Sequence, residues 1–200
     1  MPAKKRTAKK AAKKAAKKGA ATKQPAEKPA KKSGGAWAAA FGPRALGEKR
    51  YWLVKSEPDV FSFDDLLHKH NKTTQWDGVR NFAARNFLRD GMKAGDRVFY
   101  YHSMSDAPCI VGICEVVREA YPDPGAFDAT SEGYDPKSDK AAPTWYMVDL
   151  RAVAQFTHPV TLVQIKQHKD LKDMALLRIG RLSVTPVTAA EWETIRKLAG

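Results

Sequence analysis

The sequence has little of what builds disulfides, membrane spans or secretory signals. It holds only two cysteines, Cys109 and Cys114, in 200 residues. They do not form a CxxC motif and both lie in an apolar run, so they are expected to be small buried hydrophobic residues. No run of about 18 apolar residues occurs, which argues against a transmembrane helix. The basic N-terminus has no apolar segment of the kind that a secretory signal requires.

Motifs for cofactor binding and for hydrolytic catalysis are also missing. The chain has no Gly-rich phosphate loop in a βαβ context and no Gly-x-Ser-x-Gly elbow. The five histidines and two cysteines show no metal-ligand spacing. His102, Ser103 and Asp106 lie too close together along a predicted strand and turn to form a triad. We therefore expect no cofactor, no metal and no enzymatic activity, with an RNA- or nucleotide-processing enzyme as the alternative.

Positive charge is abundant but is concentrated in the first quarter of the chain. The formal net charge is +13; residues 1–50 carry 16 lysines and arginines against 2 acids, whereas residues 51–200 carry 19 against 20. A polycation of this density is suited to polyanions, and it lacks the apolar face that membrane binding needs. We expect nucleic acid as the partner, DNA before RNA, and no membrane. The expected location is cytoplasmic and nucleoid-associated, or nuclear in a eukaryote.

Residues 1–35 form a low-complexity Lys/Ala-rich tail. Pairs of lysines recur every four residues, and adjacent like charges oppose helix formation, so the free tail is expected to be disordered. Its repeats resemble the tails of linker histones and bacterial histone-like proteins. Phosphate contacts carry no base information, so such a tail would anchor DNA without reading it; a merely solubilising extension is the alternative. The candidate DNA contacts are Lys9, Lys10, Lys13, Lys14, Lys17 and Lys18.

Residues 36–49 are expected to be a linker, and residues 50–200 a folded domain of short strands and helices. Strands are predicted at 51–54, 96–102, 109–117, 144–156 and 180–187, and helices after Ser62 and Thr161 and at 80–90, 171–177 and 188–198. Gly112 suggests a bulge or bend within its strand. Residues 120–143 read as one long loop with four solvated aspartates, Asp123, Asp128, Asp135 and Asp139. The pattern predicts an α+β domain built on a partly closed β-barrel with flanking helices.

Residues 74–103 hold the densest mixture of aromatic, amide and guanidinium side chains. Asp77 is expected to cap the following helix, and Gly78 to permit a tight turn. Helical spacing predicts one buried stripe and one polar stripe. The buried stripe contains Val79, Phe82, Ala83 and Phe87, and the polar stripe contains Asn81, Arg85 and Arg89.

Several segments, taken together and in order, resemble the EVE domain family. They are Tyr-Trp-Leu-Val-Lys-Ser-Glu-Pro at 51–58, Trp-Asp-Gly-Val-Arg-Asn-Phe-Ala-Ala-Arg-Asn at 76–86, Tyr-Tyr-His-Ser at 100–103, Val-Gly-Ile at 111–113 and Gly-Arg-Leu-Ser-Val-Thr-Pro-Val at 180–187. The resemblance covers residues 50–200 and implies a PUA-like fold. It also implies nucleic-acid binding, with a modified base seated in an aromatic pocket. The Lys/Ala-rich tail departs from the family pattern.

A base held outside its stack needs aromatic faces and hydrogen bonds to its polar edge. The candidate base-pocket residues are Ser56, Trp76, Asn81, His102 and Trp145, and the candidate phosphate-binding residues are Lys55, Arg80, Arg85 and Arg181. For some of these a structural role is the alternative, with Trp145 in the core or His102 as a structural hydrogen-bonding group. We predict a domain that reads a modified base and a tail that anchors it to DNA; a histone-like packaging protein with a docking domain is the other alternative.

Overall fold

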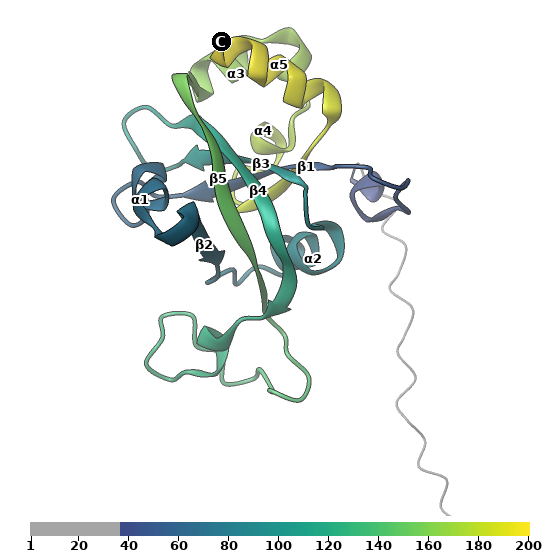
Figure 1. The fold of residues 1–200 in the computed structure, drawn as a ribbon, viewed down its shortest axis with the longest axis vertical. Helices are drawn as coiled ribbons and strands as arrows, with labels where there is room; N and C mark the ends of the chain where they lie inside the picture. Colours follow the sequence, from purple (N-terminus) through teal and green to yellow (C-terminus); the bar gives the residue numbers. More distant parts are fainter. Residues whose placement is uncertain (1–36) are drawn as a thin grey trace, which may run out of the picture. The chain divides into compact units, whose positions relative to one another are not determined.

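The computed structural model describes residues 37–200, which form a mixed six-stranded sheet flanked by short helices (Figure 1). The tail and its six candidate lysines lie outside the described residues. The strands are β1 (Tyr51–Ser56), β2 (Thr73–Trp76), β3 (Arg97–His102), β4 (Cys109–Pro122), β5 (Tyr146–Thr161) and β6 (Val184–Val187). Their order is β2-β5-β4-β3-β1-β6, and only the β1–β3 pairing is parallel. The predicted α+β class is confirmed, and the sheet is open, with β2 and β6 at its edges.

Five α-helices accompany the sheet in the described part of the chain. They are α1 (Phe63–His68), α2 (Phe82–Asn86), α3 (Leu162–Gln167), α4 (Ala175–Arg178) and α5 (Ala189–Ala199). Capping boxes begin α1 at Ser62, α3 at Thr161 and α5 at Thr188, where the sequence predicted helix starts. Short 3-10 helices cover Ala38–Phe41, His70–Lys72, Pro124–Phe127 and Lys169–Leu171.

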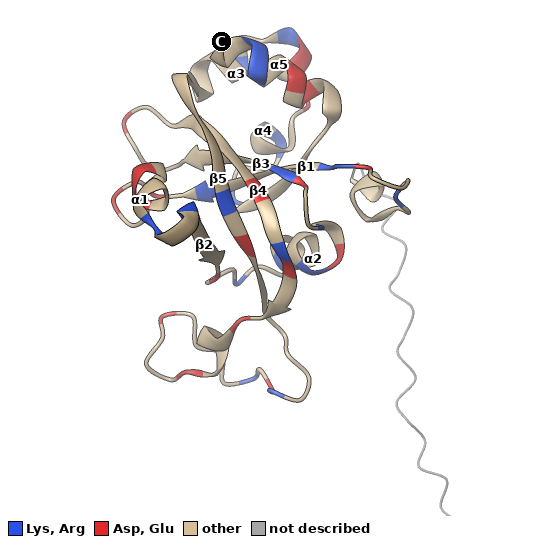
Figure 2. Ribbon diagram, viewed as in Figure 1, with Lys and Arg blue, Asp and Glu red and all other residues tan. Residues whose placement is uncertain are grey.

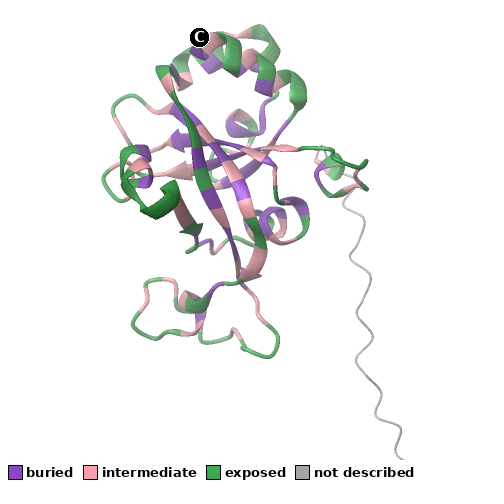
Figure 3. Ribbon diagram, in the orientation of Figure 1, coloured by how far each residue is buried: buried purple, intermediate pink, exposed green. Residues whose placement is uncertain are grey.

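The central strands are buried on both faces (Figure 3). Successive side chains of a strand point to opposite faces, so β1 places Trp52 and Val54 in one apolar cluster and Leu53 in the other. The first cluster includes residues of α1 and α2, and the second includes residues of α3, α4 and α5. This two-sided burial leaves the ends and edges of the sheet, and the exposed part of β5, to contact a ligand.

Gly112 lies where β4 changes its register against both neighbouring strands, which confirms the predicted bulge. A Cβ atom at this position would lie 2.5 Å from a ring carbon of Phe63 and 2.7 Å from the carbonyl oxygen of Ala154. Glycine therefore lets α1 pack closely on the sheet. Cys109 is half-buried and Cys114 is fully buried, and neither forms a disulfide.

The helix predicted at 80–90 differs from the observed one. Asn81, and not Asp77, caps α2 by accepting hydrogen bonds from the backbone N–H groups of Ala83 and Ala84. The chain then continues as a π-helical turn at Phe87–Gly91. Val79 precedes the helix and does not mark its buried face, which carries Ala84, Phe87, Leu88 and Gly91. The prediction that Phe82 and Ala83 are buried is therefore wrong.

Two other predicted elements are shorter than expected, and one was missed. The segment 171–177 is divided between a 3-10 turn and α4, and the strand predicted at 180–187 is reduced to β6. Strand β2 was not predicted, because four residues without clear alternation give little periodic signal. It forms at the edge of the sheet by antiparallel pairing with β5.

The segment before β1 is tied to the domain by the buried carboxylate of Asp96. Arg44 donates to both carboxylate oxygens, at 2.6 and 2.7 Å, and the indole N–H of Trp52 donates at 2.8 Å. Phe41 stacks on Phe87 with ring centroids 5.2 Å apart. A buried charge needs such partners, and here they fix residues 40–50 against the sheet.

Candidate functional site

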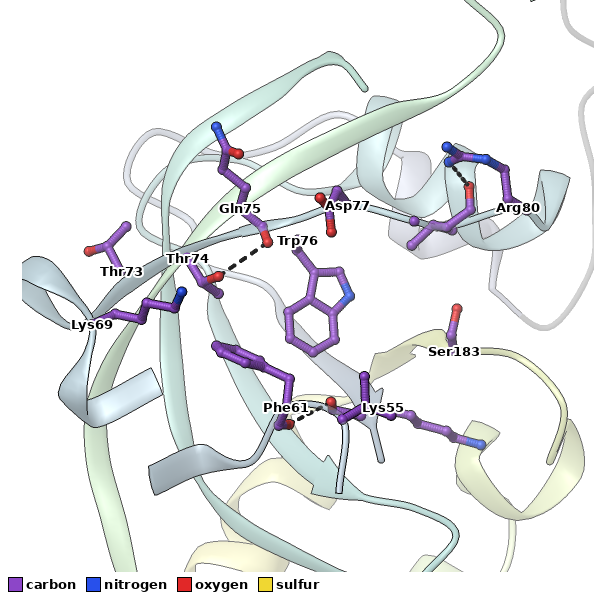
Figure 4. A pocket seen from close by; sticks show the side chains of 14 residues that line it. Lys55, Phe61, Lys69, Thr73, Thr74, Gln75, Trp76, Asp77, Arg80 and Ser183 are labelled. Atoms are coloured by element: carbon purple, nitrogen blue, oxygen red, sulfur yellow. Dashed lines mark hydrogen bonds between the residues drawn. The ribbon is translucent and has the colours of Figure 1, made fainter. Parts of the chain in front are cut away.

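A cavity of about 680 Å³ opens at the β2 edge of the described fold (Figure 4). Its walls come from the end of β1, the loop that carries Phe61, all of β2, the segment Asp77–Arg80, and Ser183. The lining therefore combines two aromatic rings with hydroxyl, amide, carboxylate and cationic groups. Cavities of roughly this size and composition receive small organic groups.

Trp76 is the aromatic centre of the cavity. It ends β2 opposite Val148, and its ring meets Tyr100 edge-on with centroids 5.5 Å apart. Only 8% of the residue is exposed. Figure 4 shows the indole beside the ring of Phe61, so that two aromatic groups border the same space. The arrangement leaves Trp76 fixed by the core on one side and facing the cavity on the other.

Phe61 is positioned by two hydrogen bonds to its backbone. Its carbonyl oxygen accepts from the hydroxyl of Ser56 at 2.7 Å and from that of Tyr100 at 2.8 Å. Both donors lie on central strands, so the loop that carries Phe61 is held against the sheet. Lys69 lies over the Phe61 ring, with its ammonium 5.8 Å from the centroid.

The wall beyond Trp76 is fixed by Asp123, which is 1% exposed. Its carboxylate accepts from the backbone N–H of Gly78 at 3.1 Å, from Arg80 Nη1 at 2.7 Å and from the backbone N–H of Gly125 at 2.8 Å. Arg80 also donates to the carbonyl oxygen of Gly133. The prediction that Asp123 is solvated is therefore wrong: it joins the long β4–β5 loop to the cavity wall.

Asp77 follows Trp76 and lies at the rim of the cavity, where it is exposed to solvent. Partial desolvation by the walls and the negative charge of Asp123 raise the pKa of its carboxyl, against the effects of its own backbone N–H and of Arg80. Gly78, with φ of +68°, then turns the chain. The rim thus carries an accessible negative charge beside the indole.

The cavity brings together four of the nine candidate pocket and phosphate residues: Lys55, Ser56, Trp76 and Arg80. Lys55 donates to the carbonyl oxygen of Gly180 at 2.7 Å, and burial lowers the pKa of its ammonium. Arg80 is engaged by Asp123 and the long loop. These two cations thus already have protein partners.

The other five candidates lie outside the cavity lining. Asn81 is the cap of α2, and Arg181 is exposed beyond α4. His102 Nε2 accepts from the backbone N–H of Phe63 at 3.1 Å, and burial lowers the pKa of its imidazole. It thereby supports the first turn of α1.

Trp145 and Arg85 belong to a second aromatic cluster, beside α2. The Trp145 indole N–H donates to Asp135 at 2.7 Å, and its ring lies 4.9 Å from that of Phe82. Arg85 donates to the carbonyl oxygen of Thr144 at 2.8 Å, and its guanidinium lies 5.0 Å from the Phe82 centroid. The exposed Phe82 makes this cluster a second surface on which a flat group could stack.

Sequence reasoning did not assign Phe61, Asp77 or residues 73–75 to the cavity. Phe61 lies in a predicted loop after Glu57-Pro58. The sequence does not indicate which way the side chain of an isolated aromatic residue in a loop points. Asp77 and Gly78 directly follow Trp76 in the chain. This adjacency was the one indication in the sequence that they line the same cavity as Trp76.

No helix among residues 37–200 is long and apolar enough to cross a membrane. The same residues contain no group of three or more His, Cys, Asp or Glu side chains arranged to hold a metal ion.

An open mixed sheet with a cavity beside its edge strand defines an α+β fold of the PUA-like class. The EVE domain model matches residues 50–198, and the chain belongs to the EVE domain family. Among relatives, thymocyte nuclear protein 1 of Gallus gallus is 42% identical over 165 residues, covering 74% of this chain and 68% of that protein. The Homo sapiens protein of the same name is 39% identical, with 74% and 73% covered.

Solved structures agree with this assignment. A hypothetical protein from Leishmania major superposes with a TM-score of 0.73 at 46% identity, covering 78% of this chain and 97% of that one. The crystal structure of human THYN1 protein in complex with DNA containing 5-methylcytosine also gives a TM-score of 0.73, at 40% identity, with 76% and 98% covered.

Replacing Asp123 tests whether its carboxylate holds the cavity wall. Asp123→Ala leaves the guanidinium of Arg80 and the N–H of Gly78 without their acceptor, and should lower the free energy of unfolding by about 3 kcal/mol. Glu193→Ala, which breaks the exposed pair with Arg196, is the control and should change it by less than about 1 kcal/mol. Urea unfolding of both variants measures the difference. Equal, small losses would show that the Asp123 contacts do not stabilise the fold.

Proposed function

We propose that this protein binds nucleic acid and that the cavity at Trp76 receives one base, with a modified base preferred over its unmodified form. The supporting observation is the cavity itself, bordered by Trp76 and Phe61 in a chain related along most of its length to a protein crystallised with 5-methylcytosine-containing DNA. A base must leave its stack to enter such a space, and aromatic faces recover part of the lost stacking energy.

The walls of the cavity are suited to a rigid ligand. Trp76 is held by Tyr100, Phe61 by Ser56 and Tyr100, and the far wall by Asp123. Because these side chains are already held in place before binding, ordering them costs little free energy when the ligand binds. We assign stacking to Trp76, with Phe61 as the opposing ring.

The folded domain is nearly neutral, which favours recognition of the base by the cavity over unspecific attraction to the phosphates. Figure 2 shows basic and acidic residues interspersed along the ribbon, and residues 51–200 carry 19 basic against 20 acidic side chains. A nearly neutral domain gains little from unspecific phosphate attraction. Lys69, at the rim, and Lys55, whose ammonium keeps donors beyond its hydrogen bond to Gly180, are our candidates for contacts to the phosphates that flank the seated base.

The basic residues of the tail complete the proposal. A polycation linked to a selective domain raises the local concentration of nucleic acid at the cavity without choosing among bases. We therefore propose that Lys9, Lys10, Lys13, Lys14, Lys17 and Lys18 contact DNA phosphates, while the domain supplies selectivity.

Replacing Trp76 tests whether a base stacks on it in the cavity. Trp76→Leu keeps an apolar side chain against Tyr100 but removes the flat stacking surface. It should weaken binding to an oligonucleotide with a single 5-methylcytosine by about 1–3 kcal/mol, as measured by fluorescence anisotropy. Thermal unfolding checks that the variant remains folded.

Trp145→Leu is the matched control, because Trp145 packs against Phe82 outside the cavity lining. It should leave the affinity nearly unchanged. The reverse result, in which Trp145→Leu weakens binding and Trp76→Leu does not, would show that the base binds at the second aromatic cluster and not in the cavity. Recovery of a chemically altered oligonucleotide would favour the enzyme alternative.

Deleting the tail tests the anchor. Removal of residues 1–35 should weaken DNA binding at low salt and flatten the dependence of log affinity on log salt, because fewer counterions are released. The preference for the modified base should remain. An unchanged salt slope after the deletion would show that the tail does not anchor DNA.

A further inference from the structure

Asp77 is the one carboxylate in the cavity lining, and the protein leaves most of its acceptor capacity free for a ligand. The buried Asp123, by contrast, accepts three hydrogen bonds from protein groups. Among residues 37–200, no other side chain donates a hydrogen bond to Asp77. Figure 4 shows the carboxylate of Asp77 next to the Trp76 side chain among the residues that line the cavity.

Several donors around the cavity are already committed to the protein. The Ser56 hydroxyl donates to the carbonyl oxygen of Phe61, and the Thr74 hydroxyl to that of Gln75 at 3.3 Å. Arg80 is held by Asp123, and Lys55 by the carbonyl of Gly180. The hydroxyl of Ser183 can donate or accept and so does not discriminate. Arg80 Nη2 is a buried donor without a protein partner among residues 37–200, whereas the ionised carboxylate of Asp77 is the one side chain of the lining that only accepts hydrogen bonds.

An ionised carboxylate only accepts hydrogen bonds, and in base recognition it pairs with an amino group such as N4 of cytosine. A base with a carbonyl at the same position would instead place an oxygen against the carboxylate. Partial desolvation and the negative charge of Asp123 raise the pKa of Asp77. The same two effects make a carbonyl oxygen of the base beside Asp77 more unfavourable, and an amino group there more favourable.

We propose that Asp77 determines specificity in the cavity by accepting a hydrogen bond from the exocyclic amino group of the seated base. The inference rests on the proposed function and names its ligand class. The preferred bases are those with an exocyclic amino group, as in cytosine and adenine, over those with a carbonyl there, as in thymine and uracil.

The test uses a pair of bases of nearly equal shape. 5-Methylcytosine and thymine differ at C4, which carries an amino group in one and a carbonyl in the other, and in the proton on N3. Three single-stranded oligonucleotides are made that differ only at one position: 5-methylcytosine, thymine or an abasic site. Binding to the full-length protein is measured by fluorescence anisotropy across a salt series.

The wild type should bind the 5-methylcytosine probe about tenfold or more tightly than the thymine probe. Asp77→Asn should reduce this ratio to about twofold, because a carboxamide can turn to present either a donor or an acceptor. Asp106→Asn is the matched control: it removes one exposed negative charge outside the cavity lining and should keep the wild-type ratio.

The outcomes separate the two proposals. If the wild type binds all three probes equally at every salt concentration, the base-seating function fails. If it binds 5-methylcytosine and thymine equally and both better than the abasic probe, the function stands and the role of Asp77 is refuted. Retention of the full ratio by Asp77→Asn also refutes that role, since another group must then make the distinction.

Discussion

The buried carboxylate of Asp123 is the contact on which the geometry of the site depends. It reaches from the loop after β4 to Gly78 and Arg80, and so fixes the segment that directly follows Trp76. The cost of burying its charge is offset by two backbone N–H groups and one guanidinium. Because of this contact, the long loop after β4 supports the cavity wall.

The position of the cavity follows from the burial of the sheet. Helices and loops cover both faces of the central strands, and the edge strand β2 offers an aromatic ring to the cavity while still drawing support from the core. β2 does this with four residues: pairing with β5 fixes its backbone, and Trp76 meets Tyr100 edge-on. The opposite edge, β6, is bordered by a separate groove of about 640 Å³ with a more apolar lining.

The sequence predicted the fold class, the family, the helix starts at capping boxes and the bulge at Gly112, because each depends on local residue chemistry. It also named Trp76 as a candidate for the base pocket, and Trp76 lines the cavity. It did not predict β2 or the burial of Asp123, since both depend on partners more than 40 residues away along the chain. The exposure of Phe82 was missed because Val79 was assigned to the buried stripe of the helix, although it precedes the helix that Asn81 caps.

The central claim is that a base enters the cavity and lies against Trp76. The most direct measurement follows the side-chain indole N–H signals of the protein's five tryptophans by NMR while a 5-methylcytosine oligonucleotide is added to the full-length chain. A stacked base should shift the Trp76 signal strongly through its ring current and leave the Trp145 signal nearly unchanged. A shifted Trp145 signal with an unchanged Trp76 signal would contradict the account.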